Sequence, residues 1–167
     1  RDSSTSRGLG DVYKRQWQAS ADISLDLGYL KYSYPREAQF NQSEVYGILS
    51  VYGVKLGAYY SDDAPGIDSQ QSTLYRYLGY ETRLPLELGL QLRYGQMDFK
   101  DPRLIRASGQ GEDSYHEWEA KLTREMAGLE LGLSYIDTDL SRSQCTSNYG
   151  FSDLCGATWV ASIKKTF

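Results

Sequence analysis

The feature that most constrains the fold is an alternation of apolar and polar residues that recurs from Trp17 to the end of the chain. In LPLELGLQLRYG (84–95), leucine occupies every second position from Leu84 to Leu92, with Pro, Glu, Gly and Gln between. A period of two places successive side chains on opposite faces of a strand, whereas a helical face repeats about every 3.6 residues. The sequence therefore predicts an all-β protein whose strands have one apolar and one polar face.

The spacing of these runs predicts the connections. We expect about eight antiparallel strands, near residues 17–33, 41–51, 54–61, 72–82, 84–95, 115–126, 128–137 and 156–167. Tight turns fall near Tyr52-Gly53, Arg83 and Ala127, and the other connections are long, polar segments. Outer-membrane barrels have short turns on one side and long loops on the other. We therefore predict an antiparallel up-and-down transmembrane β-barrel, and leave open whether these strands close by themselves.

The first sixteen residues, RDSSTSRGLGDVYKRQ, differ from the rest of the chain. They are polar, contain Arg at positions 1, 7 and 15, show no period, and lack the apolar core of a secretory signal. We interpret 1–16 as a disordered, non-native leader that resembles translated sequencing adapter. Residues 17–167 are then the barrel domain, as part of a longer protein.

Charge and hydropathy narrow the class of protein further. The formal net charge of −4 argues against a nucleic-acid partner, because phosphate binding requires a basic patch and none is visible. No stretch approaches the roughly 18 apolar residues of a membrane-spanning helix, but membrane-spanning strands need only about ten residues each. A membrane protein built from strands is consistent with both observations.

Charged side chains recur on the polar parity of the strands. Each unpaired charge in a dry core would cost several kcal/mol, so these residues need water or one another. If the apolar parity faces lipid, they line a polar lumen. The predicted lumen residues are Asp22, Asp26, Glu44, Lys55, Arg76, Glu87, Arg93, Glu117, Glu119, Lys121, Glu130 and Lys164.

Arg76 decides the orientation of QSTLYRYLGYETR (71–83), in which either parity could face lipid. A lipid-facing Arg costs ~2–4 kcal/mol near the bilayer midplane. We therefore place Arg76 in the lumen, with Tyr75, Tyr77 and Gly79 outside.

The lumen set also predicts an ion preference. Its carboxylates outnumber its bases, so a cation preference follows. We expect Lys121 to pair with Glu119, which leaves Glu117 freest to attract cations.

Aromatic residues cluster near the long loops: Tyr32, Tyr59, Tyr60, Tyr75, Tyr77, Tyr94, Tyr115, Trp118, Tyr135 and Trp159. Those that face outward would form the aromatic girdle of a membrane barrel. Alternation alone does not separate this structure from a soluble, lipocalin-like carrier, in which the apolar parity faces inward. The loop lengths, the aromatic ends and the C-terminus favour the membrane barrel.

Cys145 and Cys155 lie in one long loop, SRSQCTSNYGFSDLCGA (141–157). In an oxidising envelope, this arrangement predicts a disulfide that staples the loop, and the alternative is two free thiols. We expect no metal site, because His116 is the one His in the chain and no ligand cluster accompanies the cysteines. His116 with Asp113 suggests a barrel protease or acyl hydrolase, but a single His at a strand end is common, so we predict no catalytic residues and no cofactor.

The chain ends in CGATWVASIKKTF (155–167), an alternating strand with Phe167 at the last position. This resembles the recognition signal that Gram-negative outer-membrane barrels present to their assembly machinery, with Trp159 and Ile163 on the same parity. Lys165 departs from the pattern, since an apolar or aromatic residue is more usual there.

Several segments carry a family resemblance: LDLGYLKYSYP, SEVYGILSVYGVKLGAYYSDD, LELGLQLRYG and SYHEWEAKLTREMAGLELGLSYIDTDLS. Together with the final strand they resemble the TorF-like porins of proteobacteria, over about residues 19–167. The resemblance implies a signal peptide, about four further N-terminal strands in a barrel of about twelve, and no established catalytic residues.

These observations predict a porin of the Gram-negative outer membrane that passes small solutes or ions by diffusion. The expected partners are outer-membrane lipid and lipopolysaccharide, the barrel-assembly machinery and small solutes, with no nucleic acid. The first alternative is a structural or adhesive barrel whose lumen is filled by its own side chains. The second is the soluble carrier.

Overall fold

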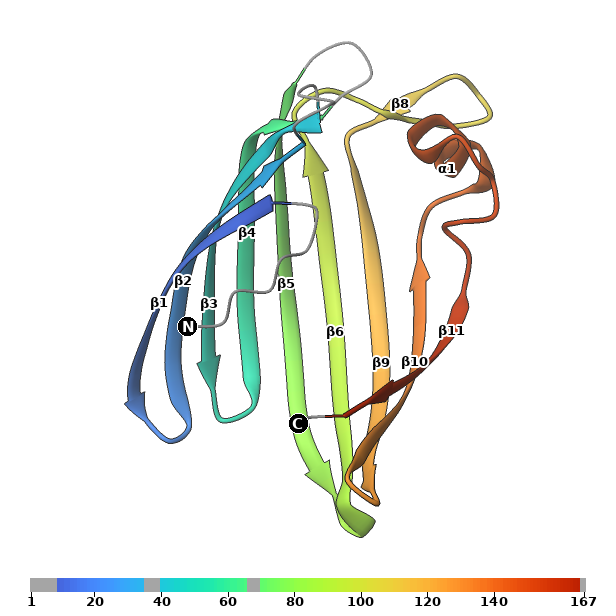
Figure 1. The fold of residues 1–167 in the computed structure, drawn as a ribbon. Helices are drawn as coiled ribbons and strands as arrows, with labels where there is room; N and C mark the ends of the chain where they lie inside the picture. Colours follow the sequence, from blue (N-terminus) through green and yellow to red (C-terminus); the bar gives the residue numbers. More distant parts are fainter. Residues whose placement is uncertain (1–8, 35–39, 66–69, 166–167) are drawn as a thin grey trace.

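The computed structural model of the chain describes residues 9–34, 40–65 and 70–165. It contains a nine-stranded antiparallel sheet whose strands follow one another in chain order (Figure 1). These strands are β1 (Leu9–Ser20), β2 (Ile23–Ser33), β3 (Gln42–Val51), β4 (Val54–Ala64), β5 (Gln71–Leu84), β6 (Leu88–Phe99), β9 (Ser114–Met126), β10 (Leu129–Thr138) and β11 (Thr158–Lys164). The predicted all-β, antiparallel architecture is confirmed, with nine strands in the sheet where about eight were expected.

Three smaller elements complete the described structure. A 3-10 turn, η2 (Pro85–Glu87), joins β5 to β6, and a two-stranded hairpin of β7 (Leu104–Ile105) and β8 (Gly111–Glu112) precedes β9. Helix α1 (Arg142–Tyr149) follows β10. Within the described residues, no helix is both long and apolar enough to cross a membrane.

The connections differ at the two ends of the sheet (Figure 1). At one end lie tight turns, such as Tyr52-Gly53 and Ala127-Gly128. Tyr52 and Ala127 have φ of 48° and 53°, and the following glycines have φ of 84° and 76°. Two successive residues at positive φ form the hairpin turn that matches the twist of antiparallel strands. Long connections lie at the other end, so the predicted alternation of turns and loops is confirmed.

β1 corrects the expected start of the fold. Leu9–Gln16 were assigned to a disordered leader, but they pair with β2, and the expected strand 17–33 is a hairpin that turns at Ala21-Asp22. The pattern conceals this turn because Trp17 lies opposite Leu25, so odd-numbered residues face the same side in both strands. The period of two therefore continues through the turn. The proposed origin of residues 1–16 stays a prediction, and residues 1–8 lie outside the described residues.

The turn expected near Arg83 lies further along the chain. β5 continues to Leu84, which pairs with Leu88, and the chain reverses at Pro85–Glu87. Pro85 has no backbone N–H to contribute to a ladder, and Leu86 and Glu87 have φ of 66° and 58°. Leucine continues to alternate through this turn. The period-two pattern therefore does not show where β5 ends and β6 begins.

The two faces of the sheet differ in composition. Residues directly opposite one another on neighbouring strands point to the same side. One row of such partners crosses five strands: Leu25, Leu49, Leu56, Leu78 and Tyr94. We call this side the leucine face and the other side the polar face. Leu56 and Leu78 are 53% and 52% exposed, so no described part of the chain covers these two leucines.

The sheet curls around its polar face. The Tyr75 hydroxyl on β5 donates a 2.6 Å hydrogen bond to Glu117 on β9, although β6 lies between these strands. A concave sheet favours such a contact, and along β4 the side chains on the polar face are less exposed than those on the leucine face. Within the described residues, β1 and β11 are the edges of the sheet and do not pair with each other, so the described sheet is curved and open.

The buried apolar cluster of the described residues lies at the loop end of the sheet. It consists of Phe99, Leu104 and Tyr115, with Met97 and Leu140 packed against it. We call residues 100–113 and 139–157 the cap; they contain β7, β8 and α1. The cap and the strand ends beneath it, and not the sheet, therefore form the conventional core.

Candidate functional site: the polar face of the sheet

Most of the predicted lumen residues share the polar face. The registers place on it Asp26, Glu44, Lys55, Arg93, Glu117, Glu119, Lys121, Glu130 and Lys164. These residues come from strands β2 to β11, so the antiparallel pairing, and not proximity in the chain, brings them together. Their shared face is what a polar lumen requires; that they line one stays a prediction.

Three predicted lumen residues lie elsewhere. Asp22 is in the turn between β1 and β2, and Glu87 is in η2, so neither stands on a strand. Arg76 is on the leucine face, opposite Ala58 and Gln96. Its guanidinium lies 3.1 Å from the Asp98 carboxylate, which stands on the same face. The prediction for Arg76 was wrong because it used the energetic cost of an unpaired arginine in lipid. In the structure, Asp98 pairs with Arg76.

The placement of Arg76 reverses the expectation for its neighbours. Tyr75, Tyr77 and Gly79 were expected outside, and they lie on the polar face with Glu81. A signal for this was present in the sequence: Gln71, Thr73, Glu81 and Arg83 share one parity of β5, and Leu74, Leu78 and Leu84 share the other. The composition of the two parities over the whole strand, and not Arg76 alone, predicts the observed orientation of β5.

Ion pairs organise the polar face. The Lys55 ammonium lies 2.7 Å from Glu81, and the Lys14 ammonium lies 2.6 Å from Asp26. Lys14 and Glu81 are two partners that the sequence analysis missed. Lys14 was missed because it falls in the segment that was set aside as a leader.

Arg93 joins two carboxylates of β9. Its guanidinium lies 3.0 Å from Glu119 and 3.6 Å from Glu117, which also accepts the hydrogen bond from Tyr75. The expected pairing of Glu119 with Lys121 is therefore wrong, and Glu117 is not the freest carboxylate. Arg93 reaches these residues because Glu119 lies directly opposite it and Glu117 is two residues further along the same face.

Tyrosines form a row on the polar face, across β3, β4 and β5. The rings of Tyr46 and Tyr59 stack with centroids 5.3 Å apart, and Tyr59 and Tyr77 stack at 6.4 Å. Tyr75 and Tyr77 stack at 5.9 Å. The predicted aromatic cluster thus divides between the faces: Tyr60, Tyr94, Trp118, Tyr135 and Trp159 are on the leucine face, and Tyr32, Tyr59, Tyr75, Tyr77 and Tyr115 on the polar face.

A cavity of about 450 Å³ lies where the tyrosine row meets the ion pairs. Its lining includes Tyr59, Tyr75 and Tyr77 together with Glu44 and Arg93. The volume is typical of a site for a small molecule. The cavity therefore combines flat aromatic surface with charge, on the face that was expected to meet solutes.

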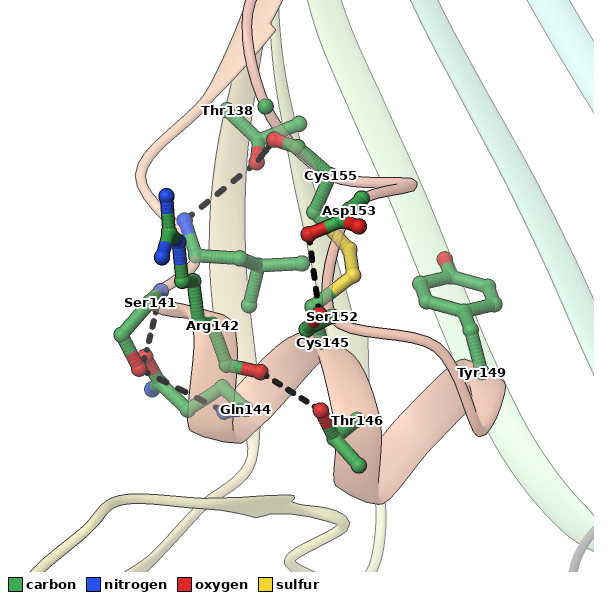
Figure 2. The surroundings of a disulfide bond; sticks show 12 residues. Thr138, Ser141, Arg142, Gln144, Cys145, Thr146, Tyr149, Ser152, Asp153 and Cys155 are labelled. Atoms are coloured by element: carbon green, nitrogen blue, oxygen red, sulfur yellow. Dashed lines mark hydrogen bonds between the residues drawn. A yellow bond between two sulfur atoms is a disulfide. The ribbon is translucent and has the colours of Figure 1, made fainter.

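The cap is stapled by the predicted disulfide. Cys145 and Cys155 are bonded, with Cα atoms 5.9 Å apart, and this prediction is confirmed (Figure 2). α1 begins at a capping box, in which Ser141 and Gln144 exchange hydrogen bonds. The Ser147 hydroxyl accepts from the Ile105 N–H at 2.9 Å, which ties α1 to β7. The two long loops thus fold against each other at the loop end of the sheet.

His116 has a partner other than the one considered. Its Nδ1 lies 2.9 Å from Asp139, not Asp113, and its ring stacks on Tyr94 with centroids 5.6 Å apart. Both rings are on the leucine face. Among the described residues, no group of three or more His, Cys, Asp or Glu side chains is placed to hold a metal ion. Whether the protein has catalytic activity stays a matter of prediction.

The proposed assembly signal is described in part. Trp159 and Ile163 project from β11 on the leucine face and are 67% and 74% exposed. Phe167 lies outside the described residues.

The chain belongs to the bacterial Gcw_chp family, described as bacterial protein of unknown function, which it matches over residues 5–167. No curated protein and no solved structure matches the chain. The two faces of the sheet are therefore the main guide to the function.

Proposed function

We propose that this chain forms a membrane-spanning part of a bacterial outer-membrane barrel, and that its polar face lines a path for the diffusion of small solutes. One observation carries the proposal: the apolar side chains of the sheet lie on its outer, convex side and remain exposed. Leu92 and Leu133 are 43% and 46% exposed, and Ile163 is 74% exposed. A soluble protein rarely leaves so large an apolar surface to water, whereas a lipid-facing surface is built in this way.

The height of the apolar surface supports the same proposal. Along β6, the leucine face carries Leu88, Leu90, Leu92 and Tyr94 before the polar Gln96. Along β10, it carries Leu129, Leu131, Leu133 and Tyr135 before Asp137. Four alternate positions at about 3.4 Å per residue span roughly 20 Å, close to the apolar band of about 25 Å on outer-membrane barrels.

The direction of curvature argues against the soluble carrier. A carrier of the lipocalin type encloses its apolar side chains and presents the polar ones to water. Here the concave side holds the ion pairs of Lys55 and Arg93, and the convex side holds the leucines. In the proposed barrel, β1 and β11 pair with further strands, because unpaired backbone groups are costly in lipid. The TorF-like resemblance supports about twelve strands in all.

The rest of the proposal follows from location. The protein would meet lipopolysaccharide at its long loops and the barrel-assembly machinery during insertion, and it would act without cofactor or chemistry. Its closest competitor is a structural or adhesive barrel with a filled interior. The observation in favour of that competitor is the contact that Tyr75 makes across β6 with Glu117, which shows side chains filling part of the concave side.

Single-channel recording in planar bilayers separates these two functions. The full-length protein should give steady open-pore steps if the polar face lines a water-filled path. Absence of steps from protein that is folded and inserted would instead favour the filled barrel.

A further inference from the structure

The cavity on the polar face has a wall of three tyrosines, Tyr59, Tyr75 and Tyr77. Two of these rings lie flat against the sheet. A Cβ added to Gly57 would come within 2.0 Å of the Tyr77 ring, and one added to Gly95 within 2.5 Å of the Tyr75 hydroxyl. Only glycine permits so close an approach. Each ring therefore covers the backbone of a neighbouring glycine, and both rings line the cavity.

Of the charged residues that line this cavity, both bases have ion-pair partners and one carboxylate has none among the described residues. The two bases of the lining are both occupied: Lys55 lies 2.7 Å from Glu81, and Arg93 lies 3.0 Å from Glu119. Glu44, the remaining carboxylate of the lining, makes no hydrogen bond or ion pair with any residue that the structure describes. The cavity thus has one uncompensated negative charge.

Glu44 also lies on the loop-end side of the cavity lining. It lies near the start of β3, which begins at the loop end of the sheet, and Tyr46 and Tyr59 occupy the next row along the polar face. A solute that arrives from the loop end meets the free carboxylate first and the tyrosine wall next.

We propose that this cavity binds an organic cation, such as a substituted ammonium ion. The face of a tyrosine ring attracts a cation placed over it, and the attraction is larger where water is partly excluded. Glu44 supplies the opposite charge. An anion is disfavoured because both bases of the lining, Lys55 and Arg93, are already paired with carboxylates. A neutral solute would not pair with the charge of Glu44. The inference rests on the proposed function only for the route by which the cation reaches the cavity.

Equilibrium binding to the purified, folded full-length protein in detergent micelles tests this directly. The probe is choline, and the control ligand is 3,3-dimethylbutan-1-ol, which has the same shape with carbon in place of the charged nitrogen. Isothermal titration calorimetry should give a Kd for choline at least about tenfold below that of the neutral alcohol, as expected for a combined ion and cation–π contact. Equal binding of the two ligands, or no binding of choline, would overturn the proposal.

Matched variants locate the site. Glu44→Gln keeps the size of the side chain and should weaken choline binding about tenfold. Glu125→Gln makes the same change on the polar face near the turn end and should leave the Kd unaltered. Equal losses in both variants would mean that overall charge, and not this cavity, attracts the probe.

Two variants of Tyr77 test whether its aromatic ring contributes to choline binding. Tyr77→Phe retains the ring and should bind choline nearly as well as the native chain. Tyr77→Leu retains an apolar side chain without the ring and should weaken binding by about 2- to 30-fold. Because Tyr77→Leu could disturb the packing over Gly57, its circular dichroism is compared with that of Tyr77→Phe. If the leucine variant is folded and binds normally, the tyrosine wall has no part in binding.

The binding and conduction measurements test the two proposals independently. A protein that gives open-pore steps but does not distinguish choline from the alcohol retains the proposed function and loses this inference. A protein that binds choline in the cavity but does not conduct retains the inference and loses the pore.

Discussion

The cap contains completely buried apolar side chains, whereas the sheet exposes many of its leucines. In the cap, Leu104 and Cys145 are completely buried, and Phe99 and Tyr115 at the adjoining strand ends are nearly so. In the sheet, Leu56 is 53% exposed, and the exposed leucines continue from strand to strand.

This difference is what we expect if the sheet faces lipid and the cap faces water. The cap buries Leu104 and Cys145 completely, satisfies its helix end with a capping box and closes with a disulfide, as a small domain in water does. The sheet holds the ion pairs of Lys14, Lys55 and Arg93 on its concave side and presents leucine on its convex side, where Arg76 and Asp98 form a further pair. A chain that meets water at its loops and lipid around its strands would be divided in this way.

The largest expected effect of a single substitution is in the cap. Leu104→Ala removes a fully buried side chain and should destabilise the cap by about 2–5 kcal/mol. Leu56→Ala, on the leucine face, removes a side chain that packs on the protein only in part and should cost much less. Hydrogen exchange of the chain in micelles measures both. Equal losses at the two sites would contradict the contrast between cap and sheet.

A charge on the leucine face distinguishes lipid from water around the sheet. Leu92→Arg should destabilise the inserted protein by ~2–4 kcal/mol, because the side chain would face hydrocarbon. In a soluble protein, the same change at a position that is 43% exposed would be nearly neutral. Gln91→Arg, on the adjacent polar-face position, is the matched control and should be tolerated. Urea unfolding from lipid vesicles gives the values.

The disulfide should stabilise the cap alone. Replacing both Cys145 and Cys155 by Ser should cost the cap about 2–3 kcal/mol, because the bond closes a short loop of the unfolded chain. The cap should become sensitive to protease between β10 and β11, while the circular dichroism of the strands stays the same. Thiol-reactive mass tagging without reduction should label neither native cysteine. Loss of strand signal in the double variant would show that the two regions are not separable.

The smallest predicted effect concerns ion preference. We expect a cation-selective pore, and we expect Glu44→Gln to lower that selectivity more than Glu117→Gln. Glu117 is already held by Arg93 and Tyr75, whereas Glu44 has no such partner among the described residues. Asp153→Asn in the cap is the control and should leave the reversal potential in a salt gradient unchanged. Anion selectivity of the native pore, or a larger shift for Glu117→Gln, would contradict this prediction.

The sequence predicts the strands well because period two is a local signal. It does not locate reversals that preserve the period: the apolar residues stay in phase through both the turn at Ala21-Asp22 and the turn at Pro85–Glu87. β1 was missed for a different reason, since Leu9–Gln16 have little alternation and acquire their structure by pairing with β2. Local patterns identify a strand more reliably than its ends.

Pairs across the sheet lie beyond a single sequence. Assigning Arg76 required knowledge of Asp98, which is far away in the chain and becomes its neighbour only through the register of β5 and β6. The same applies to the ion pair of Arg93 with Glu119. The disulfide was predictable because Cys145 and Cys155 share one loop, so that no register was needed.

Tryptophan fluorescence gives the most direct test of the central claim that the leucine face meets lipid. All three tryptophans of the chain are on that face: Trp17 opposite Leu25, Trp118 opposite Tyr94, and Trp159 opposite Tyr135. In vesicles, phospholipids with brominated acyl chains should quench this fluorescence strongly, and iodide in the water should quench it weakly. Strong quenching by iodide together with no quenching by brominated lipid would contradict the account.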